Sequence, residues 1–297
     1  MRTVKISAAL LFLVSAALAG FFVFTSPVAF QKSASIRFVD ETLFMLPEPE
    51  MHIDIEAILR PIPYSDSRMV YEVAPNEKYI QTIEQGHGNC SNLAFGLAYA
   101  LSEQGHDYQI VHLMPINGFL NGIGHTVLHM PFRLTDERHY GIVDVLEGGL
   151  PQTRSGFVHL DTLRNGSLSE ASIFSLNQRK DNESPYYDSF LDTAIVGVIY
   201  AQDVEQYFDF LESVYVPLGN KKLEKIFYDG LSLVCGTYPP NYVLKTDQDI
   251  LYKGKQAIRY LSIALLLCIR VFLLLMAMIM CFRLYSFIRK RVAYKRA

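Results

Sequence analysis

Three residues between positions 86 and 144 have side chains suited to nucleophilic catalysis. Cys90 precedes an apolar, alanine-rich segment, Leu93–Leu101, so it stands at the predicted start of a helix. His125 opens a later apolar run, and Asp144 interrupts the apolar sequence Ile142–Leu146. A thiol, an imidazole and a carboxylate are the parts of a nucleophile, its general base and the group that orients the base. These residues predict acyl-transfer chemistry through Cys90.

The neighbours of Cys90 favour a reactive thiol over a structural one. A buried cysteine is usually an inert small hydrophobic residue, whereas Cys90 is flanked by small and polar residues, Gly88, Asn89, Ser91 and Asn92. Backbone N–H groups and the dipole at a helix start stabilise a thiolate and lower the pKa of the thiol. Cys90 is therefore the predicted nucleophile.

His125 is the preferred general base because it begins an apolar strand and small residues precede it. His129, four residues later on the same face of a regular strand, is the main alternative, and His87 is a weaker one. An unpaired carboxylate inside an apolar strand is costly. Asp144 is therefore expected to hold His125 in the tautomer that serves Cys90. The alternative for Asp144 is an acid at the sheet edge that faces water.

Stabilisation of an oxyanion needs hydrogen-bond donors beside the nucleophile. The backbone N–H of Cys90 is one candidate, and the side chain of Gln85 or Gln81 is the second, with Gln85 preferred. A solvated glutamine explains Gln85 equally well. The sequence contains no H-E-x-x-H, no C-x-x-C and no glycine-rich nucleotide motif, so neither a metal nor another cofactor is predicted.

The apolar periodicity predicts helices and strands that carry these residues. A short helix at Glu77–Glu84 is broken by Gly86 and Gly88, and the helix that carries Cys90 closes at Gly105. The expected strands are Tyr108–Leu113, Gly124–Phe132, His139–Leu146 and Gly156–Leu163, and further helices are expected around His52–Leu59, Val204–Val214 and Leu223–Leu233.

Two apolar segments indicate membrane attachment. Residues 6–24 carry no charge and follow Arg2 and Lys5; a cleaved signal peptide and an uncleaved anchor both fit, and the length of the run favours the anchor. Residues 260–282 are interrupted only by Arg270 and are followed by a basic tail. Because positive charge stays in the cytoplasm, both termini are predicted to be cytoplasmic, with residues 25–259 outside, periplasmic or extracellular, at a cell inner membrane.

The charge distribution excludes nucleic acid as a partner of the central region. All 30 acidic residues but only 18 of the 27 Lys and Arg fall within residues 25–259, a net charge of about −12. Cys90 and Cys235 are the two cysteines of this region, and two cysteines do not make a disulfide framework. They are predicted to be unpaired, because a disulfide would consume the nucleophile.

The order Cys90, His125, Asp144, with Gly88-x-Cys90, Gly124-His125 and Val143-Asp144, resembles the transglutaminase-like superfamily of papain-type cysteine enzymes. The resemblance covers roughly residues 75–150. It implies an α+β fold in which a helix with the nucleophile packs on an antiparallel sheet with the histidine and aspartate. It also implies amide hydrolysis, or transfer of an acyl group to an amine. Thr126 and Val127 after the histidine, and Val145 after the aspartate, depart from the usual pattern.

The chain is thus expected to be a two-span membrane protein with a transglutaminase-like domain between its spans. Its expected parts are a cytoplasmic 1–5, a signal-anchor helix 6–24, a linker and N-terminal ectodomain 25–74, a catalytic core 75–163, a helical part 164–259, a transmembrane helix 260–282 and a basic tail 283–297. The expected partners are a peptide or amide-bearing substrate, the lipid bilayer and a membrane protein that Arg270 contacts. The alternative is a catalytically silent domain of this fold that scaffolds an envelope assembly.

Overall fold

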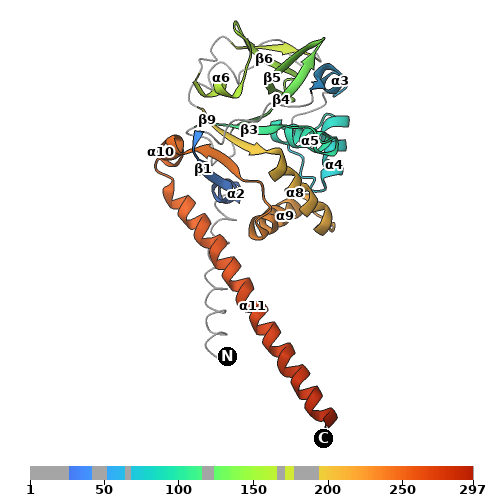
Figure 1. Cartoon of the computed structure of the whole chain (residues 1–297), viewed down its shortest axis with the longest axis vertical. Helices are drawn as coiled ribbons and strands as arrows, with labels where there is room; N and C mark the ends of the chain where they lie inside the picture. Colours follow the sequence, from blue (N-terminus) through green and yellow to red (C-terminus); the bar gives the residue numbers. More distant parts are fainter. Residues whose placement is uncertain are drawn as a thin grey trace. The chain divides into compact units, whose positions relative to one another are not determined.

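The computed structural model describes residues 27–41, 52–63, 68–115, 124–165, 171–176 and 194–296 (Figure 1). The chain divides into two compact units, one of Ser35–Lys253 and one that joins Met1–Ala34 to Gly254–Ala297. The predicted first span, 6–24, lies outside the described residues.

A mainly antiparallel sheet forms the centre of the unit Ser35–Lys253. Its order is β1–β10–β9–β3–β4–β2, and β5 also pairs with β4. The strands are β1 (Ile36–Val39), β2 (Ile53–Asp54), β3 (Gln109–Pro115), β4 (His125–Leu134), β5 (Glu137–Val143), β9 (Ala194–Tyr200) and β10 (Asn241–Leu244). Only the pairs β1–β10 and β2–β4 are parallel among these strands. The combination of this sheet with packed helices confirms the α+β class at this level.

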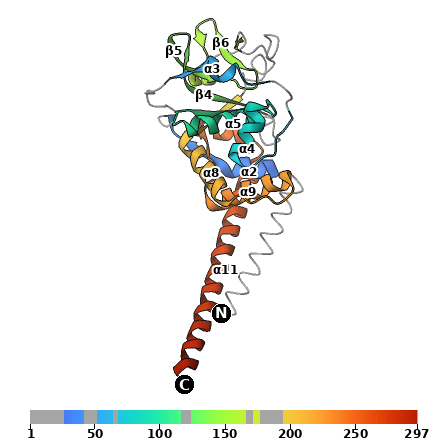
Figure 2. The ribbon, with the colours of Figure 1, turned by 90° about the vertical axis from the view of Figure 1, so that its right-hand side faces the viewer.

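Helices cover one face of the sheet, and α5 (Cys90–Glu103) packs directly on β3 and β4 (Figures 1 and 2). It packs against α4 (Pro75–Tyr79), the π-helical turn η2 (Ile80–Glu84) and α8 (Ala201–Val214), while α3 (Ile55–Leu59) contacts β4 and α9 (Lys221–Cys235) contacts α8. The apolar stripe predicted for α5 is buried as expected, with Leu93, Leu97 and Leu101 almost inaccessible. Full burial of such side chains contributes about 1.5–3 kcal/mol each, which makes α5 the central helix.

A second layer lies on the other face of β3 and β4. It consists of a three-stranded sheet, β6 (Gly149–Thr153), β7 (Gly156–Phe157) and β8 (Ser172–Ser175), with the short helix α6 (Leu160–Asn165). Val111, Val127 and Ile142 of the large sheet pack with Val158 and Ile173 of this layer in a separate apolar cluster. The large sheet is therefore buried on both faces near the start of β4.

Several elements differ from the sequence predictions. The strand expected at Gly156–Leu163 is wrong: β7 ends at Phe157, and α6 begins at Leu160. The segment predicted as a linker contributes β1 at the edge of the sheet. The part predicted as helical, 164–259, also supplies β9 and β10, and β9 pairs along its whole length with β3. Short apolar runs do not reveal which strand they pair with, so the sequence pattern missed these pairings.

The second unit contains a long apolar helix, α11 (Gln256–Arg296). Its segment Gln256–Arg283 is 28 residues long and is the one helix among the described residues that is long and apolar enough to cross a membrane. At 1.5 Å per residue it measures about 42 Å, more than the ~30 Å hydrocarbon core of a bilayer. The same unit contains α2 (Pro27–Ser35). Two short helices, η4 (Lys245–Asp247) and α10 (Gln248–Tyr252), end the larger unit.

Candidate active site

Cys90 is the first residue of α5, as the sequence predicts. Asn89 caps this helix: its side chain accepts from the backbone N–H of Asn92 at 3.0 Å, and the Asn92 side chain accepts from the backbone N–H of Asn89 at 3.3 Å. This reciprocal capping box fixes the first turn. The Cys90 thiol therefore lies where the backbone N–H groups and the positive end of the helix dipole stabilise negative charge.

Asn92 also attaches a remote segment to the start of α5. Its side-chain amide accepts from the backbone N–H of Val70 and donates to the backbone carbonyl of Val70, both at 2.9 Å. Asn92 is buried, so these bonds satisfy a polar group that would otherwise be costly to bury. Gly88 precedes the cap with a φ of 123°, a conformation that favours glycine. Sequence reasoning recognised Asn92 only as a polar neighbour and missed this connection.

His125 is the first residue of β4, and its imidazole is fully buried. Its Nε2–H donates to Oδ2 of Asp144 at 2.7 Å, a short charge-assisted hydrogen bond. Because the Asp144 carboxylate accepts the Nε2–H, Nδ1 is the ring nitrogen of His125 that can exchange a proton with a thiol. The expected contact between the predicted base and its orienting carboxylate is confirmed.

The position of Asp144 differs from the prediction in one respect. It lies just after β5, where it bridges to Gly149 by two backbone hydrogen bonds of 2.9 and 3.1 Å, so it opens a tight turn rather than standing inside a strand. Its other oxygen, Oδ1, accepts from the backbone N–H of Glu147 at 3.0 Å. Both carboxylate oxygens are thereby fixed, which orients Oδ2 towards His125.

Strand register places the two side chains on one face. Leu128 pairs with Val143 across β4 and β5. Because side chains alternate between faces along a strand, Asp144 falls on the face that also carries His125. A carboxylate and an imidazole in diagonal cross-strand positions are within reach of each other.

The electrostatics of the site favour a thiolate–imidazolium pair. Burial alone would raise the pKa of the Cys90 thiol, but the hydrogen bond and charge of His125 hold that pKa below its ordinary value. Burial would lower the pKa of His125, but the charge of Asp144, its hydrogen bond and the thiol of Cys90 raise it well above the usual range. The thiol and the imidazole contribute to each other's shift because each charged form stabilises the other, and Asp144 adds the larger part of the rise at His125.

Gly124 makes the start of β4 possible. A Cβ at this position would lie 2.9 Å from the backbone carbonyl oxygen of Leu113 on β3. Leu113 pairs with His125 in the ladder, so only glycine allows the two strands to approach so closely beside the site. The sequence analysis recognised Gly124 only as a small residue before His125 and did not foresee this close approach of the strands.

The competing histidine has another partner. Nδ1 of His129 lies 2.9 Å from Oε1 of Gln109, its direct cross-strand neighbour on β3. Burial, with a smaller contribution from the charge of His159, lowers the pKa of His129 to about 3. The imidazole of His129 thus pairs with Gln109 rather than with Asp144, so His129 is not the base that faces Asp144.

The glutamines expected at the oxyanion site are less well supported. Gln85 is exposed at the end of η2, and its role remains a prediction. The side chain of Gln81 donates to Glu72 at 3.3 Å. Cys90 and Cys235 are both free thiols, as predicted. Over the described ranges, no three His, Cys, Asp or Glu side chains are grouped in a way that could hold a metal ion.

Comparison of the chain with protein-family models, with curated proteins and with solved structures finds no match. The chemistry of this protein is therefore inferred from the geometry of the site.

Proposed function

We propose that this protein is a cysteine enzyme that transfers or hydrolyses acyl groups through Cys90. The observation that carries the proposal is the buried hydrogen bond of 2.7 Å between His125 and Asp144, with the Cys90 thiol at a helix start, 4.0 Å from the carbonyl oxygen of Gly124, the residue before His125. A buried carboxylate with both oxygens bonded would serve a purely structural histidine equally well. The position of the Cys90 thiol at the start of α5, close to the residue before His125, distinguishes the catalytic arrangement, and the lowered pKa of the thiol agrees with it.

The proposed reaction proceeds through a thioester. His125 holds the proton of the Cys90 thiol on Nδ1, and the thiolate attacks the carbonyl carbon of an amide or ester. The backbone N–H of Cys90, with Gln85 as a proposed second donor, stabilises the oxyanion. His125 then gives its proton to the leaving amine or alcohol, the C–N or C–O bond breaks, and the acyl group stays on sulfur. Water or an amine finally attacks the thioester, with His125 accepting a proton from it, and the C–S bond breaks to release the acid or new amide and regenerate the Cys90 thiolate. Asp144 orients the imidazole throughout.

The proposal also includes the fold family, the membrane topology and the class of substrate. The arrangement of a thiol on a helix against a histidine and an aspartate on a sheet is consistent with the transglutaminase-like resemblance of residues 75–150. We further propose two spans, 6–24 and 260–282, with both termini in the cytoplasm and the catalytic domain outside a cell inner membrane. The helix Gln256–Arg283 supports the second span by its length and composition. A peptide or another amide-bearing molecule is the proposed substrate.

Selective alkylation tests the proposal, because the chain supplies its own reference thiol. Cys90 is the first residue of α5, whereas Cys235 is the last residue of α9 and is exposed. Limiting iodoacetamide at about pH 6.5, followed by peptide mass spectrometry, should label Cys90 faster than Cys235 although Cys90 is less accessible. The His125→Ala variant should reverse this order, because it removes the proton acceptor.

The control is the variant His139→Ala, which removes a partly exposed histidine from β5. It should leave the labelling order unchanged. Faster labelling of Cys235 in the wild-type chain would contradict the enzymatic proposal and support the catalytically silent scaffold.

A further inference from the structure

The segment 69–72, which precedes α4, is a stretch of chain outside the helices and sheets. Burial alternates along it: Val70 and Glu72 are buried, whereas Met69 is 45% exposed and Tyr71 is half-buried. Such alternation is typical of an extended strand, in which successive side chains point to opposite faces. The segment thus has the pattern of a strand, although it pairs with none of the strands in the described part of the chain.

One anchor joins this segment to the start of α5. Both backbone groups of Val70, the N–H and the C=O, are bonded at 2.9 Å to the side-chain amide of Asn92. Asn92 is two residues after Cys90 and belongs to the capping box of the same helix. The segment is therefore held beside the helical turn that carries the candidate nucleophile.

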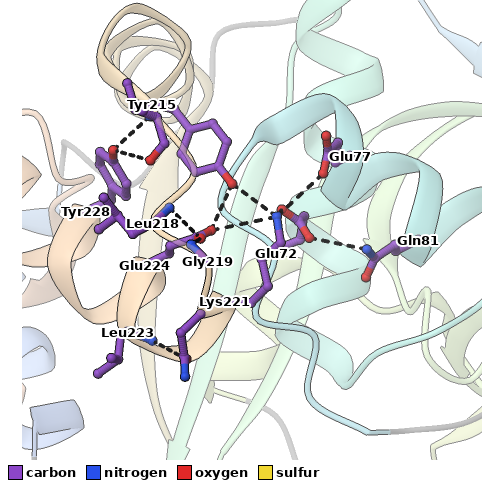
Figure 3. A network of polar contacts seen from close by, with 12 residues as sticks. Glu72, Glu77, Gln81, Tyr215, Leu218, Gly219, Lys221, Leu223, Glu224 and Tyr228 are labelled. Carbon is purple, nitrogen blue, oxygen red and sulfur yellow. Dashed lines mark hydrogen bonds and ion pairs between the residues drawn. The ribbon is translucent and has the colours of Figure 1, made fainter.

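A second anchor holds the segment two residues further on, as Figure 3 shows. The buried carboxylate of Glu72 accepts from Nζ of Lys221 at 2.6 Å and from the side chain of Gln81 at 3.3 Å. A buried carboxylate that lost these partners would be costly, so Glu72 keeps the segment attached to α9 and η2. A segment fixed at both positions loses little conformational freedom when it binds a ligand.

The first anchor also determines where the other backbone groups point. In an extended strand the N–H and C=O of one residue lie on the same side, and those of its two neighbours lie on the opposite side. Because the groups of Val70 point to α5, those of Met69 and Tyr71 point away from it. Within the described residues, no hydrogen bond engages the backbone N–H or C=O of Met69 or Tyr71. A row of such groups is a template for pairing with another chain.

A cavity of about 370 Å³ borders the same segment. Its lining includes Met69 and Tyr71, and also His87, which lies in the turn three residues before Cys90. Three residues of extended chain reach at most about 10 Å, so the cavity lies close to the nucleophile. Its volume falls within the range of about 300–1,000 Å³ that is typical of ligand sites.

We propose that the segment 69–72 binds the main chain of an extended peptide substrate as an added strand, through hydrogen bonds to the backbone of Met69 and Tyr71. This inference rests on the proposed function of Cys90 and deepens it by specifying the substrate class. In strand addition the main chain supplies the affinity. The favoured substrate is therefore an extended peptide rather than a small amide or an ester.

Peptide reagents that alkylate Cys90 test the proposal on the full-length wild-type chain. The probe is acetyl-tetraalanyl chloromethyl ketone, which has a long main chain and minimal side chains, and the reference is acetyl-alanyl chloromethyl ketone. Peptide mass spectrometry measures the rate at which each reagent modifies Cys90. The long reagent should react roughly tenfold faster or more, because it can form several further backbone hydrogen bonds.

N-methylation of single alanines in the long reagent tests the direction of these bonds. Alternate N–H groups of an extended peptide point to the same side. Methylation of either of two alternate alanines should therefore slow the modification of Cys90 by roughly tenfold, whereas methylation of the alanines between them should slow it by less than about threefold. This test requires no change in the protein.

A pair of variants tests the same bonds from the side of the protein. Met69→Pro removes the backbone N–H of residue 69 and keeps a φ compatible with an extended chain, so it should slow the long reagent by about five- to tenfold. The matched variant Met69→Ala removes the side chain but keeps the N–H, and should slow this reagent by less than about threefold.

Each other result overturns the inference. Equal rates for the long and short reagents, with iodoacetamide still labelling Cys90 ahead of Cys235, would refute the added strand and leave the proposed function intact. A long reagent that is insensitive to N-methylation would bind by something other than its main chain, and an equal loss at every alanine would exclude the alternating pairing. If iodoacetamide labels Cys235 ahead of Cys90, the proposed function fails, and this inference fails with it.

Discussion

Replacing Asp144 by asparagine removes the charge that faces His125 and keeps the shape of the side chain. In the native site, Oδ2 accepts the Nε2–H of His125 at 2.7 Å and Oδ1 accepts the backbone N–H of Glu147 at 3.0 Å. Asparagine has one oxygen, so it can continue to accept from only one of these donors. Retaining the bond to Glu147 would turn the amide NH₂ towards His125.

The structure sets the magnitude of the effect. Both side chains are fully buried, so solvent does not screen their interaction, and a hydrogen bond to a charged group contributes about 1.5–3 kcal/mol. Loss of that amount from the imidazolium lowers the pKa of His125, which in turn destabilises the Cys90 thiolate. At about 1.4 kcal/mol per factor of ten, alkylation of Cys90 below the thiol pKa should slow by roughly 10- to 150-fold. The fold should lose about 1–3 kcal/mol.

The assay is the alkylation rate of Cys90 as a function of pH, with Cys235 in the same chain as the reference. In the wild-type protein the midpoint of the pH profile should lie below the ordinary thiol value of about 8.5, because the pKa of Cys90 is lowered. The Asp144→Asn variant should move the midpoint upwards. The control Asp136→Asn changes an exposed acid in the turn between β4 and β5 and should leave the profile unchanged.

One result would refute the reasoning. If Asp144→Asn is folded, as circular dichroism would show, and Cys90 reacts with the same rate and pH midpoint as in the wild type, Asp144 only closes the turn after β5. A rate that falls equally for Cys90 and Cys235 would instead indicate a general loss of structure.

Two further predictions concern stability. Gly96→Ala in α5 should lower the free energy of unfolding by about 1–3 kcal/mol, because its Cβ would lie 2.0 Å from Oγ1 of the buried Thr82. Gly230→Ala in α9 has open space around the new Cβ and should raise the free energy of unfolding by up to about 1 kcal/mol. Urea denaturation measures both changes, and two changes of the same sign would contradict this packing. His129→Gln should reduce the loss of stability on acidification from about pH 6.5 to 4. The folded state resists protonation of His129 down to about pH 3, whereas the unfolded state takes up the proton near pH 6.5. In this range the wild-type protein therefore loses up to about 1.4 kcal/mol of unfolding free energy per pH unit through His129. An unchanged pH dependence in denaturant titrations would show that His129 is protonated in the fold.

The sequence alone predicted the residues of the candidate site and the central helix. Cys90 could be placed at a helix start because Gly86 and Gly88 break the preceding helix and an apolar periodic run follows, and these signals act within a few residues. The same local signals gave the strand that carries His125 and a strand around Asp144, although they placed Asp144 inside that strand and not in the turn after it. They also gave the long apolar helix near the C-terminus, since length and composition suffice to recognise it.

Only the tertiary structure decided which histidine meets Asp144. His125 and His129 lie on the same face of β4, so spacing could not separate them. The register of β3 places Gln109 opposite His129, and the tight turn after β5 directs Asp144 to His125. The pairing of β9 with β3, from residues far apart in the chain, was likewise invisible. Strand register and strand pairing depend on residues that are distant in sequence, and the pattern of neighbouring residues does not specify them.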